Sequence, residues 1–133
     1  MEKISVVGLG KLGACTASCL SFRGFETLGI DINQQFVDDI NNQKAPVLEP
    51  RLQEMISGSE DRLEATLNFD RAIDETDVTL IIVPTPSKED GNFSDKTMRE
   101  ALTSLCQSLK NSHKKYHLFV ITSTLSPKTC EKV

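Results

Sequence analysis

The stretch KISVVGLGKLGACTASCLSFRGFETLGID, residues 3–31, decides the fold. Its first residues form a short apolar run rich in β-branched side chains, which is typical of a strand. Gly8, Gly10 and Gly13 come directly after this run, and Asp31 stands 18 positions after the last glycine. The pattern predicts a strand, a glycine turn, a helix and a second strand. This is the setting in which a G-x-G-x-x-G sequence binds a dinucleotide.

Each position of the fingerprint has a physical role. Gly8 permits a tight turn out of the strand, Gly10 has no Cβ to block a pyrophosphate, and Gly13 lets the helix lie close to the sheet. The phosphates then meet the free N–H groups and the positive end of the helix dipole. Asp31 is expected to accept hydrogen bonds from the ribose hydroxyls and to repel a 2′-phosphate, so the sequence favours NAD over NADP.

Composition limits the classes of partner. The chain has 133 residues, 38% hydrophobic and 26% charged, with a formal net charge of −4. We therefore expect one globular domain, residues 1–133, with no basic field for nucleic acid or anionic lipid. The apolar runs are too short to cross a bilayer and no signal-peptide pattern is present. These features favour a cytoplasmic protein without a membrane partner.

The cysteines and histidines do not form a metal-binding pattern. Neither C-x-x-C spacing nor a suitable histidine arrangement occurs, so we expect no metal site. We expect the cysteines to be small buried apolar groups in a reducing compartment, with a catalytic thiol among the four as the alternative. The histidines, which flank a turn containing Lys114 and Lys115, are expected to be solvated. The residues concerned are Cys15, Cys19, Cys106, Cys130, His113 and His117.

Strand-like and helix-like segments alternate along the rest of the chain. This alternation predicts an α/β fold: a Rossmann-type, doubly wound parallel sheet of strand order 3-2-1-4-5 with helices on both faces. After the first strand, further strands are expected at 25–31, 63–67, 78–83 and 118–122. Helices are expected at about 11–23, 33–42, 51–57 and 69–75, and along the apolar stripe from Met98 to Leu109.

Three loops should then meet at the carboxyl ends of the strands, where the strand order reverses. They are residues 8–13, 84–86 and 123–127. Ser126 and Pro127 form a good helix start, with serine as cap and proline at the first helical position. Because few residues follow, this start suggests that the natural protein continues beyond Val133.

Five segments together resemble the N-terminal NAD-binding domain of the UDP-glucose/GDP-mannose dehydrogenase family. They are Val7-Gly-Leu-Gly-Lys-Leu-Gly13, Gly29-Ile-Asp-Ile-Asn33, Ala45-Pro-Val-Leu-Glu-Pro50, Val83-Pro-Thr-Pro-Ser87 with Asp90, Gly91 and Asp95, and Ser123-Thr-Leu-Ser-Pro127. The resemblance covers essentially the whole chain but only the leading part of such an enzyme. It implies oxidation of a nucleotide sugar's C6 alcohol to the carboxylate in two NAD-dependent steps, by a full-length protein that is a homodimer.

The resemblance also implies roles for individual residues. Thr85 would lie along the cofactor, and Thr124 would lie near the nicotinamide and help to position catalytic water. Thr85 could equally stabilise its own turn, Thr124 could cap the following structure, and Lys11 could be either a cation near the pyrophosphate or a solvated lysine. The residues that we assign to cofactor binding are Gly8, Leu9, Gly10, Lys11, Leu12, Gly13, Asp31, Ile32, Val83, Pro84, Thr85, Ser123 and Thr124.

The chain departs from the family in several places. Phe36 stands where a basic residue is usual, Lys11 replaces a frequent aromatic residue, and Lys128 occupies a position that is often glycine. The family's nucleophilic cysteine, its lysine and asparagine, and its acidic water-activating group have no counterpart in residues 1–133. We therefore expect this chain alone to bind NAD and to oxidise nothing.

Two other functions stay open from the sequence. One is a stand-alone NAD-sensing regulatory domain, which fits the short length but not the Val-Pro-Thr-Pro and Ser-Thr-x-x-Pro loops. The other is the cofactor domain of a different NAD-dependent dehydrogenase, such as a hydroxyacid or 6-phosphogluconate type. The paired loops also argue against that assignment, but less decisively than they argue against the regulatory domain.

Overall fold

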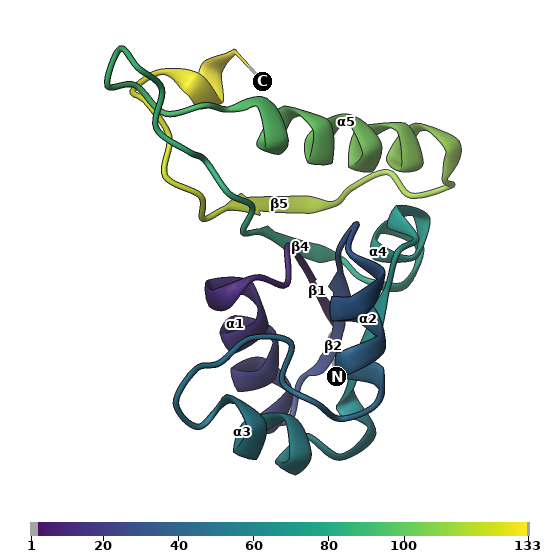
Figure 1. Ribbon diagram of the computed structural model, residues 1–133. Coiled ribbons are helices and arrows are strands. Elements are labelled where there is room, and N and C mark those ends of the chain that lie inside the picture. Colours follow the sequence, from purple (N-terminus) through teal and green to yellow (C-terminus); the bar gives the residue numbers. More distant parts are fainter. Residues whose placement is uncertain (1–2, 133) are drawn as a thin grey trace.

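The computed structural model describes residues 3–132 and is built on one parallel sheet of five strands (Figure 1). The strands are β1 (Lys3–Val7), β2 (Glu26–Ile30), β3 (Leu63–Thr66), β4 (Val78–Ile81) and β5 (Leu118–Ile121). Their order in the sheet is β3-β2-β1-β4-β5, and every neighbouring pair is parallel. The predicted fold class and strand order are confirmed.

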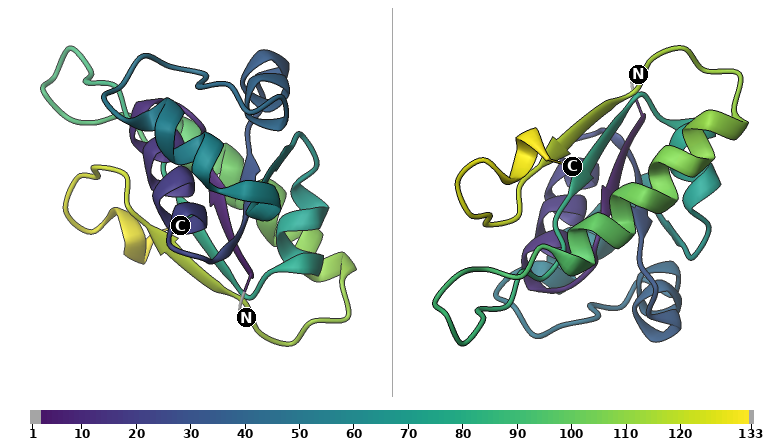
Figure 2. Two further views of the ribbon diagram at one scale, coloured as in Figure 1. Left: turned by 90° about the horizontal axis from the view of Figure 1, so that it is seen from below. Right: turned by 90° about the horizontal axis from the view of Figure 1, so that it is seen from above.

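Helices cover both faces of the sheet, as the alternating pattern predicts. The helices are α1 (Lys11–Phe22), α2 (Gln34–Asn41), α3 (Leu52–Gly58), α4 (Phe69–Glu75) and α5 (Lys96–Asn111), with short 3-10 turns η1 (Glu60–Arg62) and η2 (Thr129–Glu131). Figure 2 shows α1 and α3 in front of the strands in one view and α5 in front of them in the opposite view. No helix within residues 3–132 is long and apolar enough to cross a membrane.

Each face of the sheet carries its own apolar core because successive side chains of a strand point to opposite faces. Val6 of β1 packs with residues of α1, α2 and α3, whereas the adjacent Val7 packs with residues of α4 and α5. On α1, Ala14 and Ala17 are fully buried. Their small side chains allow the helix to lie close to the sheet.

The expected burial of the cysteines is wrong. Cys15 is only partly buried, and Cys19, Cys106 and Cys130 are exposed. On α1 the sheet-facing positions are taken by alanine and serine, which leaves Cys15 and Cys19 on another face of the helix. Its partial burial and then the nearby Glu49 carboxylate raise the pKa of the Cys15 thiol.

The prediction that both histidines are exposed is wrong for His117. His113 is exposed, but His117 is 7% exposed and lies in a chain of buried hydrogen bonds. Its Nε2 is 2.7 Å from Thr79 Oγ1, which is 2.6 Å from Ser5 Oγ. The ring also packs against Phe119, with centroids 5.0 Å apart. These tertiary contacts bury the His117 side chain, although the neighbouring lysines in the sequence predict that it is exposed.

The expected helix start at Ser126 and Pro127 is also wrong. Lys128 has a left-handed backbone with φ 67°, which interrupts any helix begun at Pro127, and only the single turn η2 follows. The Ser126 carbonyl instead accepts hydrogen bonds from the Thr129 amide (3.2 Å) and hydroxyl (2.8 Å). This closed turn replaces the cap that the sequence predicts.

Candidate functional site

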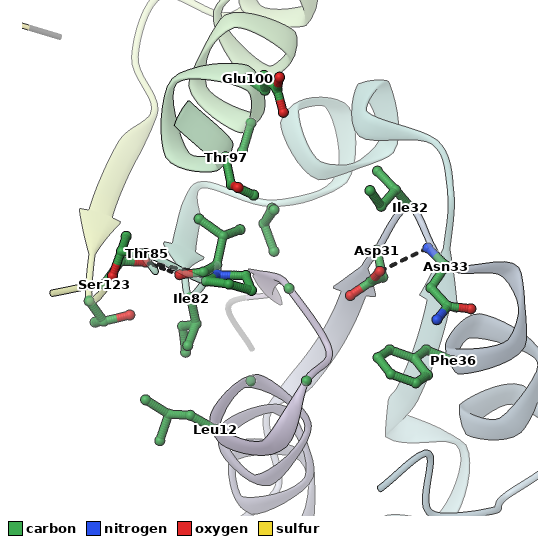
Figure 3. Close-up of a pocket in the computed structure, with 18 of the residues that line it drawn as sticks. Leu12, Asp31, Ile32, Asn33, Phe36, Ile82, Thr85, Thr97, Glu100 and Ser123 are labelled. Atoms are coloured by element: carbon green, nitrogen blue, oxygen red, sulfur yellow. Dashed lines mark hydrogen bonds between the residues drawn. The ribbon is translucent and has the colours of Figure 1, made fainter. Parts of the chain in front are cut away.

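A cavity of about 690 Å³ lies at the carboxyl ends of the strands, where the order of the sheet reverses between β1 and β4. Figure 3 shows its walls: the glycine turn after β1, the segment beginning at Asp31 after β2, the loops after β4 and β5, and one face of α5. The three loops that the sequence places together do meet here. The segment after β2 and helix α5 complete the enclosure.

The glycine turn can be built only from glycine at two of its three positions. Gly8 has φ 94°, and a Cβ there would lie 2.2 Å from the Ile82 carbonyl oxygen. A Cβ on Gly13 would lie 1.7 Å from the Gly8 carbonyl oxygen, which is backbone and cannot move aside. Gly10 differs, because a Cβ there would meet nothing within 4 Å. Its missing side chain leaves open space for a ligand.

The start of α1 presents free backbone donors to the cavity. The Ala14 amide donates to the Gly10 carbonyl at 2.8 Å, so the amides of Lys11, Leu12 and Gly13 come before the first bond of the helix. Together with the helix dipole they favour an anion. The Lys11 side chain is 79% exposed, and its Nζ lies 3.6 Å from Glu49 Oε1. In this structure the Lys11 ammonium therefore pairs with Glu49.

Asp31 is held in place by the backbone on both sides of it. The Leu9 amide of the glycine turn donates to Asp31 Oδ2 at 2.6 Å, and the Asn33 amide donates to Oδ1 at 2.8 Å, the bond drawn in Figure 3. Each carboxylate oxygen keeps further capacity to accept hydrogen bonds. The acid therefore fixes the glycine turn relative to β2 and still offers acceptors to hydroxyl groups in the cavity.

The loops after β4 and β5 are tied together by Ser123. Its hydroxyl accepts from the Val83 amide at 3.0 Å and donates to the Val83 carbonyl at 2.9 Å. Thr85 and Thr124, which also line the cavity, have no side-chain hydrogen bond within residues 3–132. Ser123 thus holds the two loops side by side, and the neighbouring threonine hydroxyls stay free.

All but one of the residues assigned from the sequence line the cavity. The exception is Leu9, whose side chain is fully buried in the core. Gly29 of β2 makes room for it, because a Cβ at that position would lie 2.9 Å from Leu9 Cδ2. Leu9 contributes to the site through its amide, which holds Asp31, and its side chain belongs to the core.

Sequence analysis missed the wall formed by α5. Thr97, Glu100, Ala101 and Ser104 line the cavity from this helix, and Phe69 does so from α4. The three polar residues of this wall, Thr97, Glu100 and Ser104, are spaced i, i+3 and i+7. This polar stripe, beside the apolar stripe of α5, was the sequence signal that could have predicted the wall. Asn33 and Phe36 also line the cavity, next to Asp31. Phe36 therefore contributes an aromatic ring at the position where the resemblance leads us to expect a basic residue.

The ionisable groups among the lining residues are Lys11, Asp31 and Glu100, with neither cysteine nor histidine beside them. In the part of the chain that the structure describes, no group of three potential metal ligands comes together. The described lining offers hydrogen-bond donors, acceptors and apolar walls. Such a surface binds and orients a ligand and carries no thiol nucleophile.

The sheet order, the glycine turn, the free start of α1 and the acid after β2 define a Rossmann-type dinucleotide-binding domain. Residues 2–133 match the model of the UDP-glucose/GDP-mannose dehydrogenase family, NAD binding domain. The chain belongs to this family, whose cofactor in this domain is NAD. The geometry fits that dinucleotide, since Gly10 leaves room beside the free amides of α1 and Asp31 stands at the next strand end.

Comparison with known proteins agrees with this assignment. The chain is 38% identical to a GDP-mannose 6-dehydrogenase of Pseudomonas syringae pv. syringae over 133 residues, which are 98% of the chain and 30% of the relative. It is 36% identical to a UDP-glucose 6-dehydrogenase of Haloferax volcanii, covering 96% of the chain and 29% of the relative. The crystal structure of a ternary complex of GDP-mannose dehydrogenase from Pseudomonas aeruginosa superposes with a TM-score of 0.92 at 34% identity, covering 98% and 30% of the two chains. The chain thus spans about 30% of the length of these relatives.

Proposed function

We propose that this chain is the cofactor-binding part of a nucleotide-sugar 6-dehydrogenase. The observation that carries the proposal is the convergence, around one cavity, of the free α1 start, Asp31 and the paired loops of Thr85 and Thr124. Relatives that match along nearly the whole chain are named for oxidation of GDP-mannose and of UDP-glucose. A nucleotide sugar is therefore the substrate class that we propose for the whole protein.

Different residues of the chain bind different parts of the cofactor. The amides of Lys11, Leu12 and Gly13 bind the diphosphate, and Asp31 accepts from the adenosine ribose hydroxyls. The other half of the dinucleotide runs toward the loops of Val83–Thr85 and Ser123–Thr124. When bound, NAD supplies the hydride acceptor.

The two free threonine hydroxyls act at the nicotinamide end in this proposal. Thr85 hydrogen-bonds along the cofactor, and Thr124 orients a water molecule beside the nicotinamide. Each hydroxyl can donate one hydrogen bond and accept others. Ser123 acts indirectly, by keeping the backbone of these two loops together through Val83.

We further propose that the chain alone turns over no nucleotide sugar. The second oxidation of an alcohol to a carboxylate through a covalent intermediate needs a nucleophile. None of the four cysteines lines the described cavity. The nucleophile and the sugar site would come from parts of the full-length protein outside these 133 residues, in a homodimer.

The test is calorimetric titration of the chain with NAD and NADP. We expect NAD to bind at least tenfold more tightly, because the 2′-phosphate meets the Asp31 carboxylate and loses a hydroxyl donor. Asp31→Ala should weaken NAD binding by at least tenfold and remove most of the preference. Asp74→Ala, which removes an exposed acid of α4 outside the cavity lining, is the matched control.

Equal affinity for both dinucleotides, or an Asp31→Ala variant that binds NAD as the parent does, would contradict the ribose assignment. Inactivity is tested separately by incubating the chain with NAD and either GDP-mannose or UDP-glucose. Formation of NADH by pure protein would show that the chain is a complete catalyst.

A further inference from the structure

The cavity continues past Asp31 into a space between Ile32 and α5. Ile32 is 85% exposed and lines the cavity together with Phe69 of α4 and Ala101 of α5. In Figure 3, Glu100 extends from α5 toward the cavity, and Ile32 flanks the same region on the other side of Asp31 from Leu12. This region therefore combines apolar side chains with one carboxylate at its rim.

If Asp31 holds the adenosine ribose, as the proposed function requires, the base attached to that ribose lies beside it. An adenine ring is flat and largely apolar on its faces, and its edge carries an exocyclic amine that only donates hydrogen bonds. The apolar groups of Ile32, Phe69 and Ala101 suit the faces of such a ring. The amine then needs an acceptor at the rim.

Glu100 is the strongest acceptor that α5 offers there. Its neighbours in the lining, Thr97 and Ser104, carry hydroxyls that both donate and accept, whereas an ionised carboxylate only accepts. Within residues 3–132 its one ion pair is a distant one with Lys96, whose Nζ is 4.0 Å from Glu100 Oε1. Arg99, the adjacent cation, is engaged by Asp95 at 2.8 Å. The Glu100 carboxylate is thus available to a ligand.

We propose that Glu100 accepts a hydrogen bond from the exocyclic amine of the cofactor's base and makes the site select a 6-amino purine over a 6-oxo purine. This inference rests on the proposed function and deepens it. A 6-oxo purine places an acceptor where the amine would be, so two acceptors would face each other. Discrimination against that ligand follows from the charge of Glu100.

The experiment compares NAD with its deamino analogue, nicotinamide hypoxanthine dinucleotide, by calorimetric titration of the 133-residue chain. We expect the parent chain to bind NAD about tenfold more tightly than the analogue, the size of one hydrogen bond to a charged group near the surface. Glu100→Ala should weaken NAD binding and bring the two affinities within about twofold. Glu100→Gln, whose amide both donates and accepts, should also bind the two ligands about equally.

Glu26→Ala is the control, because Glu26 is exposed at the opposite, amino end of β2 and should leave the tenfold ratio unchanged. A parent chain that binds NAD but does not distinguish the analogue overturns the inference and leaves the proposed function standing. The same holds if Glu100→Ala keeps the parent ratio. A chain that binds no NAD overturns both.

Discussion

Ser123 and Thr124 are adjacent, but removal of their hydroxyl groups should change two different properties of the chain. Ser123→Ala deletes two hydrogen bonds, one from the Val83 amide at 3.0 Å and one to its carbonyl at 2.9 Å. Thr124→Val removes a hydroxyl that has no partner within the described chain. The first change should act on the folded structure, and the second on ligand binding.

The size of the first effect follows from the contacts. A typical intramolecular hydrogen bond contributes about 0.5–1.5 kcal/mol, and a donor left without a partner away from water costs about 1–3 kcal/mol. Val83 is half-buried, so water can satisfy part of its freed amide. We expect Ser123→Ala to lower the free energy of unfolding by about 1–2 kcal/mol. Thr124→Val, on an exposed loop, should change it by less than about 0.5 kcal/mol.

Urea unfolding followed by circular dichroism measures the stability change, and calorimetric titration measures NAD affinity. Thr124→Val should weaken NAD binding while leaving the urea midpoint near that of the parent. Ser123→Ala should lower the midpoint without changing the slope of the transition. If Ser123→Ala unfolds at the parent's midpoint, the Val83 contacts do not hold the loops. If Thr124→Val binds NAD unchanged, its hydroxyl does not face the cofactor.

Two further changes test the backbone strain at Lys128 and the burial of His117. Lys128→Gly relieves a left-handed conformation at φ 67° that costs a side chain about 1–2 kcal/mol, and glycine's extra freedom in the unfolded chain offsets part of the gain. We expect urea unfolding to show a net stabilisation of about 0.5–1 kcal/mol that Lys128→Ala does not reproduce. Burial, and then the nearby Lys114 ammonium, lower the pKa of His117, so the folded chain binds fewer protons than the unfolded chain just below about pH 6.5. The stability that comes from neutral His117 is therefore complete above that pH and is lost as the pH falls below it. His117→Gln, which keeps a hydrogen-bonding amide near Thr79, should lose less stability than the parent between pH 7.5 and 5.5, and an equal loss would contradict this assignment.

The parts of the site that could be predicted are those encoded by neighbours in the sequence. The glycine turn, Asp31 and the loops after β4 and β5 each follow a strand directly. In a parallel sheet the carboxyl ends of the strands share one edge, so recognising the strands was enough to bring these segments together. Their convergence on one cavity confirms that reasoning.

The parts that escaped prediction depend on contacts between distant segments. Thr97, Glu100 and Ser104 line the cavity only because α5 packs against α4 and presents that stripe above the strand ends. Leu9 is buried because the pairing of Val6 with Gly29 brings a residue without a side chain beneath it. Periodicity identifies such stripes but does not say which stripe meets which neighbour.

Local rules failed where tertiary contacts were stronger. Ser126 and Pro127 satisfy the usual preferences for a helix start, yet the Ser126 carbonyl closes a turn with Thr129 and Lys128 becomes left-handed. His117 follows Lys114 and Lys115 closely in the sequence, but its ring is buried and hydrogen-bonded to Thr79. In both cases the local structure depends on a hydrogen bond whose partner cannot be identified from sequence preferences.

The double attachment of Asp31 also limits how the dinucleotide preference of the chain can be re-engineered. An engineer who replaces the acid to admit a 2′-phosphate also removes the acceptor of the Leu9 amide and loosens the turn that must grip the diphosphate. A successful redesign would put a short neutral acceptor, such as the hydroxyl of serine, in the acid's place and install a cation at Phe36. Simple deletion of the charge would give a domain that accepts either coenzyme poorly.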